Sequence, residues 1–162
     1  MTTQFASLLS QKYLDGYAIT AFTGSESRYD GLFSVACDVA AEDSAGPNAV
    51  TGISKDMFSA GTFRRTNQWL EFKLNLADLI DELELSDGEP NKKYYSQVNL
   101  VVCWAATGTG GEAYGLTPCD ESNWRTRSFP GTTHFLVQAG SDHRVEVIAL
   151  ETLIPRLIDA IA

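Results

Sequence analysis

The spacing of apolar residues changes several times along this chain, and each change marks the end of one predicted element. Apolar positions at helical spacing predict an amphipathic helix over Thr3–Leu14. Two stretches rich in aromatic and β-branched residues follow, and they predict strands over Tyr17–Phe22 and Tyr29–Cys37. A third strand is predicted over Gln68–Asn75, where apolar and polar residues alternate.

The second half of the chain shows the same kinds of pattern. Leu76–Leu85 has one apolar and one acidic face, which predicts a helix. Val98–Ala106 is continuously apolar and β-branched, as is typical of a central strand covered on both faces. Two further strands are predicted over Thr133–Val137 and Arg144–Ala149, and Glu151–Ala162 predicts a closing amphipathic helix.

The remaining segments lack a regular pattern. Ala40–Thr51 is small, polar and turn-rich, and we expect a surface excursion there. Phe58–Thr66 is either another short strand or part of that excursion, and Glu112–Gly131 looks irregular. A helix between two neighbouring strands, Gln68–Asn75 and Val98–Ala106, predicts a βαβ crossover and therefore an α/β domain with a mixed sheet.

Composition narrows the class of protein. The 162 residues suit one domain, residues 1–162, with a full hydrophobic core. No apolar run reaches the length of a membrane span, and the first ten residues carry no basic region before an apolar stretch, so we expect a cytoplasmic protein. The formal net charge of −9 argues against autonomous nucleic-acid binding, because phosphate neutralisation supplies most non-specific affinity.

One charge pair interrupts the third strand. Glu71 and Lys73 are two residues apart and therefore project from the same face of a strand. They form either a salt bridge on a solvated face, which contributes at most about 1 kcal/mol, or part of a metal-dependent active site. In the second interpretation Glu71 binds a cation and Lys73 stabilises an anion. Asn75 projects from that face too and would add a polar contact.

Asp30 lies near the start of the preceding strand. If the two strands pair, Asp30 and Glu71 would converge on one side of the sheet, and two carboxylates with water and a phosphate oxygen suit Mg²⁺ or Mn²⁺. The metal would activate water, and Lys73 would orient that water or stabilise the developing charge. The alternative for Asp30 is an ordinary turn carboxylate before Gly31.

These motifs resemble the PD-(D/E)xK nuclease superfamily. The resemblance rests on Tyr29-Asp30-Gly31, on Leu70-Glu71-Phe72-Lys73, and on the helix and apolar strand that follow. It implies a restriction-endonuclease-like α/β/α core and metal-dependent phosphodiester hydrolysis, with DNA as the substrate. The catalytic residues would be Asp30, Glu71 and Lys73, of which Asp30 and Glu71 would bind the metal.

A narrower resemblance adds a partner. Leu-Glu-Phe-Lys, the sequence Val-Asn-Leu-Val-Val-Cys-Trp, and the segments Phe129–His134 and His143–Leu150 are similar to a nuclease-like domain at the C-terminal end of some bacterial histidine-kinase/gyrase-type ATPases. This similarity implies a partner ATPase domain or protein and a role in bacterial defence.

Two alternatives stay open. Many superfamily members carry a Glu on the first helix, whereas Thr3–Leu14 has none. The chain would then be a catalytically inactive nuclease-fold domain that binds protein or nucleic acid. A further reading is a decoy whose acidic helix, Leu76–Leu85, mimics nucleic acid. Candidate nucleic-acid contacts, besides Asn75, are the basic residues of two short clusters: Arg64, Arg65, Lys92 and Lys93.

Overall fold

A computed structural model describes residues 2–11, 14, 16–23, 27–39, 53, 61–107 and 113–161. The predicted excursion over Ala40–Thr51 lies outside these residues. The helices are α1 (Thr2–Ser10), α2 (Leu76–Glu84) and α3 (Leu150–Ile161). The strands are β1 (Tyr17–Phe22), β2 (Gly31–Val39), β3 (Gly61–Asn75), β4 (Val98–Ala105), β5 (Tyr114–Pro118), β6 (His134–Gln138) and β7 (Arg144–Ala149).

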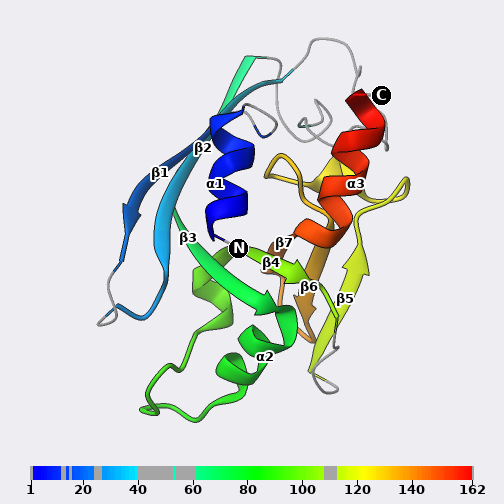
Figure 1. Cartoon of the computed structure of the whole chain (residues 1–162). Helices are drawn as coiled ribbons and strands as arrows, with labels where there is room; N and C mark the ends of the chain where they lie inside the picture. Colours follow the sequence, from blue (N-terminus) through cyan, green and yellow to red (C-terminus); the bar gives the residue numbers. More distant parts are fainter. Residues whose placement is uncertain are drawn as a thin grey trace.

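The strands form a mixed sheet in the order β1-β2-β3-β4-β7-β6-β5 (Figure 1). The three central strands, β3, β4 and β7, are parallel, and the outer pairs on both sides are antiparallel. The parallel pairing of β3 with β4 requires a crossover, and α2 lies within it. The predicted βαβ unit is therefore confirmed.

Helices cover both faces of the sheet. On one face Phe5 of α1 and Leu153 of α3 pack with strand residues such as Leu70, Leu100 and Ile148. On the other face four apolar residues of α2 pack against the alternate residues of β4 and β7. The predicted α/β/α architecture with a mixed sheet is thus confirmed, and it is consistent with a restriction-endonuclease-like core.

The sequence of α2 explains its position. Leu76, Leu79, Ile80 and Leu83 follow the i, i+3, i+4, i+7 spacing of a helix face, and all four are buried. Full burial of such side chains contributes about 1.5–3 kcal/mol each. The opposite face is acidic and exposed. The helix begins after Asn75, where the Asp78 carboxylate accepts a hydrogen bond from the Asn75 amide.

Several predicted boundaries are wrong. Strand β3 has 15 residues and begins at Gly61, earlier than predicted. It joins the strand predicted over Gln68–Asn75 to part of the possible short strand Phe58–Thr66. Strand β5 lies in the segment interpreted as irregular. Gly115 and Pro118 weaken the β-pattern, and pairing with β6 stabilises the strand instead. No helix among the described residues is long and apolar enough to cross a membrane.

Candidate active site

The candidate site begins with a close approach of β1 and β2. Gly31, the first residue of β2, pairs with Leu70 on β3. A Cβ at Gly31 would lie 2.9 Å from the carbonyl oxygen of Ala21 on β1, so this position favours glycine. Asp30 immediately precedes Gly31 and therefore lies next to Glu71, the residue that follows Leu70 on β3.

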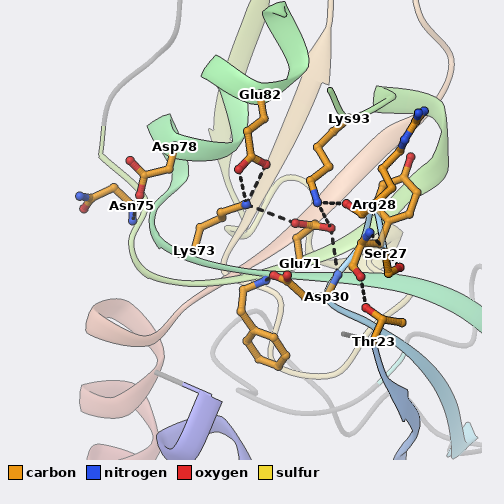
Figure 2. Close-up of polar contacts among 12 residues, drawn as sticks. Thr23, Ser27, Arg28, Asp30, Glu71, Lys73, Asn75, Asp78, Glu82 and Lys93 are labelled. Carbon is orange, nitrogen blue, oxygen red and sulfur yellow. Dashed lines mark hydrogen bonds and ion pairs between the residues drawn. The ribbon is translucent and has the colours of Figure 1, made fainter. Parts of the chain in front are cut away.

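Two reciprocal hydrogen bonds join Asp30 to β3. The Asp30 amide donates to Oε1 of Glu71 at 3.3 Å, and the Phe72 amide donates to Oδ2 of Asp30 at 2.7 Å. Asp30 and Glu71 are therefore neighbours, and Figure 2 shows the Glu71 carboxylate directed toward Lys73 and Lys93 while it accepts the Asp30 amide. The two carboxylates repel each other electrostatically, which requires compensating charge nearby.

Two lysines compensate the charge of Glu71, which is fully buried. Nζ of Lys93 donates to Oε1 at 3.1 Å, and Nζ of Lys73 lies 3.3 Å from Oε2 (Figure 2). The second contact is close enough for an ion pair but lacks the geometry of a hydrogen bond. Within the described part of the chain, Oε2 accepts no hydrogen bond although it is buried.

Lys73 is shared between two acids. Its Nζ lies 2.7 Å from both oxygens of Glu82, which projects from α2. Side-chain exposure is 12% for Lys73 and 25% for Glu82, so this pair faces solvent more than the pair with Glu71 does. Lys73 thus links the buried carboxylate of β3 to the helix that follows it.

The surroundings of Glu71 and Lys73 shift the pKa values of both side chains. Burial raises the pKa of Glu71, and the Asp30 carboxylate raises it further, while Lys93 and Lys73 oppose the shift. Burial lowers the pKa of Lys73, but the carboxylates of Glu82 and Glu71 outweigh it, so that the pKa is raised on balance. Lys73 is accordingly a cation in the folded protein.

An open pocket of about 520 Å³ lies over these side chains. Its walls include Asp30, Lys73 and Glu82, together with residues of two loops. Four basic residues line the pocket: Arg28, Lys73, Lys92 and Lys93. Three acids, Asp30, Glu82 and Glu89, also line it, so the pocket wall carries one more cation than carboxylates in a chain whose net charge is −9.

The other predicted contact residues are distributed unevenly. Lys92 lines the pocket, although its Nζ donates to the carbonyl of Leu83 at the end of α2. Asn75 precedes α2, two residues beyond Lys73. Arg64 and Arg65 precede Glu71 on β3 by six or seven residues, which is about 20 Å along a strand. They do not belong to this site.

Sequence reasoning missed the roles of two residues. Lys93 was a candidate surface contact, but it is only 6% exposed, and its Nζ also donates to the carbonyl of Arg28. Glu82 belongs to the acidic face of the predicted helix Leu76–Leu85, and the sequence assigns it no contact with Lys73. The sequence did offer one indication for Glu82. Because α2 begins three residues after Lys73 and folds back over β3, a residue of its acidic face can reach that lysine. No local pattern marks Lys93, since its partner is 22 residues away.

No protein-family model matches the chain, and no curated protein or solved structure is significantly similar to it.

Proposed function

We propose that the protein is a metal-dependent phosphodiester hydrolase in which Asp30, Glu71 and Lys73 form the active site. The observation that carries this proposal is the pair of reciprocal hydrogen bonds between Asp30 and β3. These bonds hold Asp30, which lines the pocket, against the buried Glu71, whose carboxylate contacts Lys73. The four cations of the pocket wall would attract an anion such as a phosphodiester.

The donor atoms present suit a hard divalent cation. Oε2 of Glu71 is buried without a hydrogen-bond donor among the described residues, and Asp30 is bonded to the same segment of β3 through the Phe72 amide. No group of three or more His, Cys, Asp or Glu side chains that could hold a metal occurs in that part of the chain. The remaining ligands would be water, main-chain or phosphate oxygens, which Mg²⁺ and Mn²⁺ accept readily.

Each residue of the site would have a separate task. Asp30 and Glu71 would bind the metal, which activates water and offsets charge on the phosphoryl group when bound. Lys93 would keep Oε1 of Glu71 occupied and so fix the orientation of the carboxylate. Lys73, as a partly exposed ammonium group, would stabilise negative charge that develops on the phosphoryl oxygens.

Hydrolysis by the purified chain tests this proposal. We expect Mn²⁺-dependent hydrolysis of phosphodiesters, measured on both bis(p-nitrophenyl) phosphate and DNA. Glu71→Gln and Lys73→Met should each reduce the rate by about 100-fold or more. Asp159→Asn is the matched control, because this exposed residue lies on α3, across the sheet from α2. Equal rates for Glu71→Gln and the control, or no hydrolysis of any ester, would overturn the assignment.

A non-catalytic binding domain on the same fold is the second candidate. Its specific support is that the charges around Glu71 compensate one another: Glu71 contacts two lysines, and Lys73 contacts Glu82 at 2.7 Å. A network of this kind can stabilise a fold without any ligand. The partner ATPase domain, the role in bacterial defence and the cytoplasmic location remain predictions from the sequence under either candidate.

A further inference from the structure

We propose that the substrate of this site is a small phosphodiester of about dinucleotide size, and that duplex DNA is a poor substrate. This inference rests on the proposed hydrolase function and specifies its substrate class. It follows from the size of the pocket, the way its cations are fixed, and the sign of the charge on the helix beside it.

The volume of the pocket suits a small molecule. About 520 Å³ falls in the middle of the 300–1,000 Å³ range of ligand pockets. The chain closes around this space from two sides, since residues of the loop before β2 and of the loop after α2 both line it. A duplex would instead require an extended surface that contacts phosphates along the helix axis.

The cations of the pocket are tied to its walls. The guanidinium of Arg28 lies 4.6 Å from the centre of the Tyr94 ring, and Nζ of Lys92 lies 5.8 Å from the same ring. Lys92 is also bound to a helix carbonyl, and Lys93 is bound to Glu71. The cations are therefore fixed in the wall of one pocket of limited volume, and we expect two or three phosphate contacts in all.

The surroundings of the pocket would repel a longer polyanion. Helix α2 carries the exposed acids Asp78, Asp81 and Glu84, and the turn after it carries Asp87 and Glu89, also exposed. Glu89 itself lines the pocket. Carboxylates act on a neighbouring phosphate over a Debye length of about 8 Å at physiological salt. A duplex that passes beyond the pocket on this side would meet negative charge.

Salt dependence separates the two substrate classes. A protein with six to ten phosphate contacts loses about 10³- to 10⁵-fold in affinity for DNA between 50 and 200 mM salt. The same relation gives a loss of about tenfold for two contacts. A small phosphodiester held at one point should therefore be hydrolysed with only weak salt dependence.

The experiment compares two substrates with the full chain and Mn²⁺. The value of kcat/KM per phosphodiester bond is measured for a thymidine dinucleotide and for a 20-base-pair duplex, at 50 and 200 mM NaCl. We expect the dinucleotide to be favoured by about tenfold or more, with a salt effect of about tenfold or less. Preference for the duplex, with a steep salt dependence, would overturn this inference and leave the hydrolase function standing. Failure to hydrolyse either substrate would overturn both.

A charge variant tests the contribution of α2 separately. Asp81→Asn combined with Asp87→Asn removes two exposed acids of α2 and the turn after it, one adjacent in sequence to Glu82 and one two residues from Glu89, both of which line the pocket. We expect this variant to raise duplex cleavage by about tenfold while dinucleotide hydrolysis stays constant. Glu121→Gln with Asp159→Asn changes the net charge equally, at exposed positions beyond β5 and on α3. Equal effects of the two double variants on duplex cleavage would contradict the proposed repulsion by α2.

Discussion

Replacing Lys93 by methionine tests whether charge holds Glu71 in its orientation. Methionine is also unbranched and fills a similar space, but it has no charge and donates no hydrogen bond. In the folded protein the Lys93 ammonium contacts Oε1 of Glu71 at 3.1 Å, and both side chains are buried. Lys93→Met would therefore leave a buried carboxylate with one cation fewer.

The magnitude follows from the burial of the pair. Removal of one partner from a buried ion pair destabilises a protein by about 3–5 kcal/mol, because the other charge stays buried without compensation. Glu71 retains Lys73 at 3.3 Å and the amide of Asp30. We therefore expect the lower end, about 3 kcal/mol. For a domain of this size that corresponds to a fall in Tm of about 6–12 °C.

Urea unfolding of four proteins measures the effect: wild type, Lys93→Met, Glu71→Gln and the double variant. The double variant has no buried carboxylate left without its cation, so its loss of stability should be smaller than the sum of the two single losses by about 2 kcal/mol. Lys92→Met is the matched control, since this lysine donates to the Leu83 carbonyl, which is uncharged; we expect a loss of at most about 1 kcal/mol. Strictly additive losses, or a Lys93→Met protein as stable as the control, would refute the reasoning.

Three further predictions concern stability. Burial raises the pKa of Glu146, so the folded protein binds a proton at a higher pH than the unfolded chain does. In urea unfolding, wild type should therefore gain stability relative to Glu146→Gln as the pH falls from 7 to 4.5, and a relative loss would contradict this sign. Gly131→Ala should cost about 2 kcal/mol in thermal unfolding, because φ is +83° and a Cβ would lie 2.6 Å from a leucine side chain; unchanged Tm would count against it. Glu82→Gln leaves Lys73 paired with Glu71, and chemical denaturation should show a loss of no more than about 1 kcal/mol. A loss of about 3 kcal/mol would show that the partly exposed Lys73–Glu82 pair contributes more than an exposed ion pair does.

The central part of the fold was predictable because its local and global patterns agree. The helix face of Leu76–Glu84 and the continuous apolar run of β4 each match their final environment, and together they predict the βαβ crossover. The edges were less predictable. Strand β5 contains Gly115 and Pro118, so its β-structure depends on pairing with β6, which the local sequence does not encode.

The candidate site was predictable in part. Glu71 and Lys73 share a strand face by simple alternation, and pairing of neighbouring strands brings Asp30 to them. The compensation of charge was not predictable. Lys93 reaches Glu71 from a loop, and Glu82 reaches Lys73 from α2, so both contacts depend on how the crossover closes over β3.

The proposed metal site depends on two carboxylates, and calorimetric titration with Mn²⁺ tests it most directly. We expect the wild-type chain to bind one Mn²⁺ ion, and Asp30→Asn and Glu71→Gln to lose this binding while each variant stays folded. Asp159→Asn should bind as wild type does. Absence of Mn²⁺ binding in wild type, or unchanged binding in both carboxylate variants, would contradict a metal centre at Asp30 and Glu71.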